Sequence, residues 1–145
     1  MKIFYDYQAF VSDTKFGGVS RYFVEIFKRL EIPFIISILK SQNYYIKEIK
    51  SNIYDIFPHY SFKGKRRIRI FINKVYTLLL LLFKRYDIIH LTGENIYPHY
   101  LIRNKPIIVT IHDCTIEHIT NNSQPLHKRV ELFKRVSHII AVSQN

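Results

Sequence analysis

The sequence predicts an α/β fold in one domain that covers residues 1–145. Several short runs rich in Ile, Val and Phe do not alternate apolar with polar residues, which is typical of strands buried on both faces. Between these runs lie stretches with the apolar spacing of amphipathic helices. Because strands that alternate with helices form right-handed βαβ units, we expect a Rossmann-like parallel sheet of about five strands with helices on both faces.

The expected strands are the apolar runs themselves. They cover residues 3–5, 34–39, 88–91 and 107–111, and a fifth run covers residues 139–142. The chain is long enough for one domain with a sizeable apolar core and too short for two. No internal repeat or low-complexity linker divides it.

Three helices are expected between the strands. The first has one apolar stripe and ends before Pro33; the stripe is Val19, Tyr22, Phe23, Ile26, Phe27 and Leu30. The second covers about residues 65–85, and we expect its apolar stripe to face the core; this stripe is Ile68, Phe71, Ile72, Val75, Leu79 and Leu82. The third covers residues 126–135, with Leu126, Val130 and Phe133 turned inward. The segment 41–60 fits either a loop or a helix over residues 45–53.

The chain is strongly basic, with a formal net charge of +11. Nucleic acid, an anionic membrane surface and a phosphorylated substrate all fit this charge, and so does a plain compositional bias toward Lys. One basic cluster begins the second helix and consists of Lys63, Lys65, Arg66, Arg67 and Arg69. No nucleic-acid motif or aromatic stacking platform accompanies the cluster, so nucleic acid is the less favoured partner. We expect the cluster to contact anionic lipid while the apolar stripe of the same helix stays in the core.

The expected compartment is the cytoplasm, including the inner face of the membrane. Asp6 interrupts the first apolar run before a secretion signal can form. The longest aliphatic run, residues 78–82, is far shorter than the ~20 residues that cross a bilayer. Cys114 is the only cysteine, which excludes an internal disulfide, fits a reducing compartment and favours a buried structural thiol over a nucleophile.

Candidate site residues follow three of the strands, where ligands bind in open parallel sheets. Gly17 and Gly18 lead into the first helix, and there a ligand can approach the backbone closely and an anion meets free N–H groups. His112 and Asp113 follow the strand over residues 107–111, and their side chains can bind sugar hydroxyls or act as a base. The alternatives are a plain turn at the glycines and a capping Asp113 beside a half-buried His112.

A third loop and a metal site are weaker candidates. The loop Thr92-Gly93-Glu94-Asn95 follows the strand over residues 88–91, and it fits either the lining of the same cleft or a solvated loop. His112, Asp113 and His118 show no recognisable metal-ligand spacing, so we expect no metal and no other cofactor.

At these residues the chain resembles family 4 of the retaining, metal-independent glycosyltransferases. Four segments carry the resemblance, in matching order and spacing: Phe-Gly-Gly-Val-Ser-Arg-Tyr at 16–22, Asp-Ile-Ile-His at 87–90, Val-Thr-Ile-His-Asp at 109–113 and Ser-His-Ile-Ile-Ala-Val-Ser at 137–143. The last segment departs from the family pattern, because Ser137 replaces the usual Ala and His138 the usual Asp.

The resemblance implies one half of a two-domain enzyme of the B type. The amino-terminal domain, 1–145, would hold the glycan or lipid-linked acceptor, and a carboxyl-terminal domain, absent from the sequence, would hold the nucleotide-sugar donor. Gly17 and Gly18 would lie near the donor phosphates, His112 near the transferred sugar, and Arg21 and Asp113 on the acceptor side.

We therefore expect the acceptor-side half of a hexosyltransferase for surface polysaccharide or lipid-linked glycan synthesis, inactive alone and with no catalytic residue of its own. The alternative function is a basic module that binds a membrane or nucleic acid and has no catalytic role.

Overall fold

A computed structural model describes residues 1–12, 14–94, 97, 102, 105–112 and 130–142. It contains a five-stranded sheet in the order β2-β1-β3-β4-β5, in which every pairing of neighbours is parallel. The strands are β1 (Ile3–Tyr5), β2 (Phe34–Ile36), β3 (Ile88–Leu91), β4 (Ile107–Ile111) and β5 (His138–Ala141). The predicted Rossmann-like parallel sheet is confirmed, and β1, β3 and β4 have the predicted bounds.

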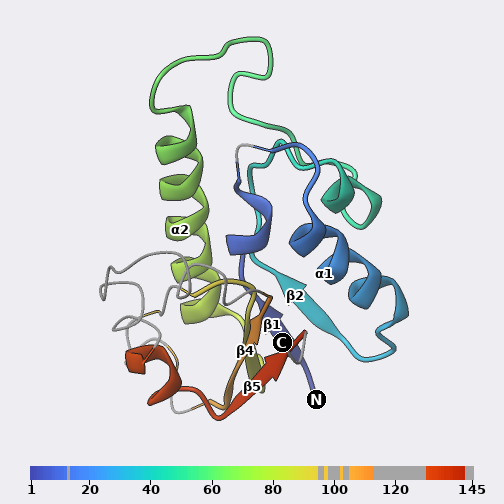
Figure 1. Ribbon diagram of the computed structural model, residues 1–145, viewed down its shortest axis with the longest axis vertical. Helices are drawn as coiled ribbons and strands as arrows, with labels where there is room; N and C mark the ends of the chain where they lie inside the picture. The colour runs from blue at the N-terminus through green and yellow to red at the C-terminus, as the bar shows by residue number, and fades with distance from the viewer. Residues whose placement is uncertain (13, 95–96, 98–101, 103–104, 113–129, 143–145) are drawn as a thin grey trace.

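Two long helices cover the two faces of this sheet. Helix α1 (Gly18–Arg29) connects β1 to β2, and α2 (Lys65–Phe83) precedes β3. The two connections run in opposite directions along the sheet, because β2 and β3 lie on opposite sides of β1. Right-handed crossovers therefore place α1 and α2 on opposite faces, as Figure 1 shows.

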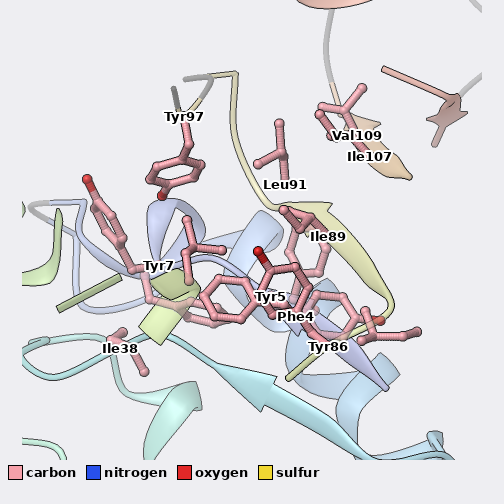
Figure 2. Packing of buried hydrophobic residues seen from close by; sticks show 14 of the residues in the cluster. Phe4, Tyr5, Tyr7, Ile38, Tyr86, Ile89, Leu91, Tyr97, Ile107 and Val109 are labelled. Carbon is pink, nitrogen blue, oxygen red and sulfur yellow. The ribbon is translucent and has the colours of Figure 1, made fainter. Parts of the chain in front are cut away.

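Aromatic rings fill the core on both faces. On the α1 face, the ring of Tyr5 lies 4.8 Å from that of Phe27 and 6.4 Å from that of Phe23. Phe4 points to the other face, because side chains alternate along a strand, and its ring lies 5.3 Å from that of Tyr86. Figure 2 shows Tyr5, Phe4 and Tyr86 in one cluster with Ile89 of β3. Each such ring stabilises the fold by roughly 1.5–3 kcal/mol through burial.

Strand β2 is shorter than predicted. It ends at Ile36, although the apolar run continues to Leu39. The backbone N–H of Ser37 still donates to the carbonyl of Tyr5 in β1, but those of Leu39 and Lys40 donate to Oδ1 of Asn73, at 2.7 and 3.1 Å, so the end of the run bonds to α2.

The segments that precede the helices contain two short 3-10 helices. They are η1 (Gln8–Phe10) and η2 (Tyr45–Glu48). The second of them lies in the segment 41–60 and is shorter than the helix weighed for residues 45–53.

Helix α2 is oriented opposite to the prediction. The residues that it buries are mostly polar: Arg69, Asn73, Thr77 and Leu81. The expected core stripe is largely exposed, with Ile68, Phe71, Val75, Leu79 and Leu82 between 40% and 66% accessible. The polar face is buried because it bonds to groups that need partners; the Thr77 hydroxyl, for example, lies 2.9 Å from that of Ser37, just beyond β2.

The carboxyl-terminal elements also expose side chains that we expected to be buried. Val130 and Phe133 are exposed and Leu132 is buried, so the predicted inward face there is wrong for the described residues; Leu126 lies outside them. Ile139 and Ile140 of β5, the edge strand of the described sheet, are exposed as well.

Candidate functional site

The carboxyl ends of β1 and β3 form the point where the strand order reverses. From β1 the sheet continues to β2 in one direction and to β3, β4 and β5 in the other. In open α/β sheets, ligands bind in the crevice outside the strand ends at such a switch point. Because the pairings are parallel, Asp6, Thr92 and His112 leave the sheet at the same edge.

Asp6 ties the loop after β1 to the loop after β3. Its carboxylate is fully buried, and its Oδ1 accepts hydrogen bonds from the backbone N–H of Thr92, at 2.8 Å, and from the Thr92 hydroxyl. Its Oδ2 accepts hydrogen bonds from the Gln8 side-chain amide and from the Tyr97 hydroxyl. The N–H of Ala9 donates back to Thr92 Oγ1 at 3.0 Å. One carboxylate thus holds both loops of the switch point together.

The same contacts determine the electrostatics of this link. Burial raises the pKa of Asp6, and the hydrogen bonds from Thr92 and Gln8 oppose that effect. Burial, with the nearby Asp6, also raises the pKa of Tyr97, so its hydroxyl stays protonated as a donor. At Gly93 an added Cβ would lie 2.7 Å from the Gln8 side chain, so only glycine fits where the two loops meet.

The glycine pair begins α1 without a side-chain cap. Gly17 is the residue that precedes the helix, its backbone is extended, and its carbonyl accepts hydrogen bonds from Arg21 N–H and from the Ser20 hydroxyl. No side chain caps this end, and the first turn contains no acidic residue. A Cβ on Gly18 would meet nothing within 4 Å, so neither backbone conformation nor packing requires glycine there. The N–H groups of the first turn are the groups that favour an anion.

His112 lies at the end of β4, against α1. Its ring is edge-on to that of Tyr22, with centroids 4.9 Å apart, and 5.6 Å from that of Phe23. Its Nε2 is buried and has no hydrogen-bond partner among the residues that the structure describes. Burial lowers the pKa of His112, so the imidazole is neutral at neutral pH.

A second neutral histidine lies beside it. His90 of β3 is buried, with Nε2 at 2.8 Å from the Thr110 hydroxyl. Burial, with a contribution from His112, lowers the pKa of His90 to about 4. The α1 face of the sheet therefore presents two uncharged imidazoles, and among the described residues Nε2 of His112 has no hydrogen-bond partner.

A comparison with known protein families identifies the family of this chain. The family model of Glycosyltransferase Family 4 matches residues 16–145, a range that contains the glycine pair and His112. The chain belongs to Glycosyltransferase Family 4. No curated protein and no solved structure matches it. The resemblance carried by the four sequence segments is thereby confirmed at the level of the family.

In this Family 4 domain, three of the predicted site residues, Gly17, Gly18 and His112, lie around the start of α1. Gly17 and Gly18 begin the helix, and His112 packs against its second turn. Arg21 faces η2 instead, with its guanidinium carbon 5.4 Å from the centre of the Tyr45 ring. Asp113 lies outside the described residues. The binding roles of these residues, and of the Thr92–Asn95 loop, stay predictions.

The basic cluster is divided by the fold. Arg69 is only 1% exposed and forms a two-pronged pair with Asp55, with Nε to Oδ1 at 2.8 Å and Nη2 to Oδ2 at 3.2 Å. The expectation that Arg69 contacts a membrane is therefore wrong. Lys65 also pairs with Asp55, at 2.8 Å, whereas Lys63, Arg66 and Arg67 are exposed.

Sequence reasoning missed Asp6 as a site residue. The available signal was its position, since a carboxylate directly after a buried strand must find partners at the edge of the sheet. Its partner Thr92 is 86 residues away in the sequence, so the pair itself could not be seen from the sequence.

Two further findings concern the described residues only. No helix among them is both long enough and apolar enough to cross a bilayer. No group of three or more His, Cys, Asp or Glu side chains that could hold a metal ion occurs among them either. Cys114 and His118 lie outside them, so their expected roles are not tested.

Proposed function

We propose that this Family 4 domain is the acceptor-side half of a nucleotide-sugar-dependent glycosyltransferase for surface polysaccharide or lipid-linked glycan synthesis. The observation that carries the proposal is His112 Nε2, a buried nitrogen without a partner among the described residues, at the switch-point edge of the sheet. A buried polar atom without a hydrogen-bond partner costs about 1–3 kcal/mol. A ligand hydroxyl that pairs with His112 Nε2 would remove this cost.

In this proposal each predicted residue has a distinct task. The neutral imidazole of His112 exchanges a hydrogen bond with a hydroxyl of the transferred sugar. The uncapped start of α1 faces the donor diphosphate, and Gly18 leaves open the space that a Cβ would occupy. Arg21 and Asp113 belong to the acceptor side.

Most of the electrostatic stabilisation of the departing diphosphate comes from the donor-binding domain, as the family resemblance implies. Such stabilisation is a large part of catalysis in transfers of this kind. We therefore expect the 145-residue chain alone to bind ligands weakly and to transfer no sugar.

The test of the site uses Gly18→Ala and His112→Ala in NMR titrations with UDP, GDP and their sugar conjugates. The parent should show amide shifts at Gly17, Gly18 and His112. Gly18→Ala should keep or slightly raise the free energy of unfolding, because Ala favours a helix over Gly by about 0.5–1 kcal/mol, and should still weaken nucleotide binding. Unchanged nucleotide affinity in Gly18→Ala would remove the role of the glycine pair.

The inactivity of the isolated chain is tested separately by product analysis with each nucleotide-sugar. The expected result is no transfer and no hydrolysis. Turnover that His112→Ala abolishes would show that the chain is a complete enzyme and would overturn this part of the proposal.

A second candidate function, compatible with the first, is peripheral contact with an anionic membrane at its cytoplasmic side. The observation that favours it is the exposed stripe of α2, in which Phe71 is 66% accessible. The basic residues Arg67 and Lys74 lie on the same exposed side of the helix, and Lys63 and Arg66 lie at its start. An apolar stripe bordered by Lys and Arg is the pattern of a helix that lies in the plane of the membrane interface.

Vesicle co-sedimentation tests the membrane contact. The parent should bind phosphatidylglycerol vesicles, less at high salt, because each Lys or Arg at such a surface contributes about 1 kcal/mol. Phe71→Ser and the triple change of Lys63, Arg66 and Arg67 to Gln should each reduce binding. The matched triple change of Lys84, Lys134 and Arg135 to Gln should have little effect. Equal losses in both triple variants, or tighter binding to DNA than to vesicles, would contradict the proposal.

A further inference from the structure

Two adjoining cavities lie beside the glycine pair and belong to no function described so far. Their volumes are about 440 and 480 Å³, and both are lined by Gln42, Pro58 and Lys65. The walls come from the residues just before the glycine pair, from the segment around η2, and from the connection that leads into α2. Figure 1 shows these segments together at one end of the molecule. We call the joined cavities the basic trough.

The trough contains far more positive than negative charge. Its lining includes five cationic residues: Lys15, Lys47, Lys65, Arg66 and Arg69. Its one carboxylate, Asp55, is already shared between Lys65 and Arg69. Lys15 and Lys47 have no carboxylate partner among the described residues. The trough is thus left with unneutralised positive charge in a concave site, which attracts an anion.

Part of this charge is fixed in place by the fold. Arg69 Nη1 donates to the carbonyl oxygen of Ser12 at 3.1 Å, and Lys65 Nζ donates to the carbonyl oxygens of Phe57 and Tyr60 at 3.0 and 2.8 Å. Both side chains belong to α2, so these bonds anchor the loop before α1 and the connection before α2 to the same helix and hold the two walls in place. The trough is therefore a formed site rather than a gap between loops.

The rim of the trough is aromatic. Phe16 and Tyr44 are more than half exposed, and their rings lie 5.4 Å apart. Tyr54 and Tyr60 are exposed on the other segments of the lining. Exposed rings offer flat apolar faces to the C–H face of a sugar ring, while phenol hydroxyls bond to its oxygens.

We propose that the basic trough binds the acidic group of the acceptor, a phosphate or diphosphate attached to a sugar. This inference rests on the proposed function, because it assigns the acceptor to a place next to the proposed donor contacts. Lys15 and Phe16 directly precede Gly17, and the carbonyl of Lys15 accepts a hydrogen bond from the N–H of Tyr44 at 2.8 Å. The acceptor sugar on the aromatic rim would then lie beside the start of α1, where the donor sugar is expected.

The test begins with a titration of the protein with inorganic pyrophosphate at constant ionic strength. Calorimetry and NMR measure the binding. The variant Lys15→Gln/Lys47→Gln should weaken pyrophosphate binding about tenfold or more, the effect of losing at least one hydrogen bond to a charged group. The control Lys84→Gln/Lys134→Gln makes the same change in net charge at exposed positions outside the trough and should change binding less than about twofold, since exposed distant charges are screened. Absence of pyrophosphate binding, or equal losses in both variants, overturns the proposal.

Two more arms separate this proposal from the proposed function and identify the source of the phosphate. If Gly18→Ala abolishes pyrophosphate binding and Lys15→Gln/Lys47→Gln leaves it unchanged, the anion binds at the start of α1. That result overturns the trough proposal and leaves the proposed donor site intact. Glucose 1-phosphate and neutral phosphatidylcholine vesicles that carry a polyprenyl diphosphate sugar are then compared. Stronger binding of either ligand to the trough supports recognition of a phosphate attached to a sugar, and the preferred ligand identifies the source of that phosphate. If neither ligand binds, the proposal is overturned.

Discussion

Asp6 shows how a single buried carboxyl group can organise a switch point. Burying a carboxylate is costly unless its oxygens accept hydrogen bonds, and here the donors come from both loops that border the crevice. The loops are therefore positioned by the requirement to satisfy one residue. This is a positioning role, because Asp6 is fully buried and reaches a ligand only through the backbone that it holds.

Replacing Asp6 measures that role. Asp6→Ala removes the acceptor of the Thr92 N–H and of the Gln8 side-chain amide, so we expect the free energy of unfolding to fall by about 3 kcal/mol in urea denaturation. Asp6→Asn keeps an oxygen for Thr92 and should lose less. The matched control is Asp87→Ala, whose carboxylate is 56% exposed and accepts one bond from the Lys2 N–H. A loss in Asp6→Ala no larger than that of the control would refute the positioning role.

At the scale of one element, α2 shows that the burial of a helix face is decided by bonding as well as by hydropathy. Asn73 is completely buried, and all of its side-chain hydrogen-bonding groups are used. It accepts from the N–H groups of Leu39 and Lys40 and donates to the carbonyls of Lys40 and Arg69. Beyond Ser37, whose N–H still bonds to Tyr5 of β1, the polar face of α2 supplies the acceptor for the N–H groups of Leu39 and Lys40.

Asn73→Ala tests this account of α2. The change improves helix propensity, yet it leaves backbone groups of Leu39 and Lys40 without partners, so we expect a net loss of about 2–4 kcal/mol in the free energy of unfolding. Lys74→Ala, at the adjacent exposed position, should change stability by less than about 0.5 kcal/mol. If Asn73→Ala is as stable as Lys74→Ala, the hydrogen bonds of Asn73 do not decide which face of α2 is buried.

At the scale of the whole molecule, stability should fall in mild acid because the core contains a neutral histidine. The pKa of His90 is about 4 in the folded state, against the ordinary histidine value of 6.5, so the unfolded state binds more protons between these two pH values. The unfolding free energy should therefore decrease as the pH falls from 6.5 to 4, with a slope of up to about 1.4 kcal/mol per pH unit from this group. Well above pH 6.5, where His90 is deprotonated in both the folded and the unfolded state, it should contribute no slope.

The measurement is the difference in unfolding free energy between the parent and His90→Gln across this pH range. Subtraction removes the titration of the other groups, including Asp6, whose raised pKa acts in the opposite direction. The parent should lose stability relative to the variant below pH 6.5. A difference that does not vary with pH would mean that His90 titrates normally in the folded chain.

The sequence by itself determined the parallel sheet, the bounds of β1, β3 and β4, and the residues that follow those strands. Continuous apolar runs and the periodicity of α1 are local properties, and they were sufficient for these elements. The family could also be inferred from the segments around Gly17 and His112, because their order along the chain is visible without a structure.

The tertiary structure alone decided the orientation of α2, the early end of β2 and the pairing of Asp6 with Thr92. Each depends on hydrogen bonds between residues 33 to 86 positions apart, and local patterns contain no information about such partners. It also divided the basic cluster, burying Arg69 on Asp55 and leaving Arg67 exposed, because a helix points neighbouring residues in different directions. The basic trough exists only in three dimensions, since Lys15, Lys47 and Lys65 meet there from three separate segments.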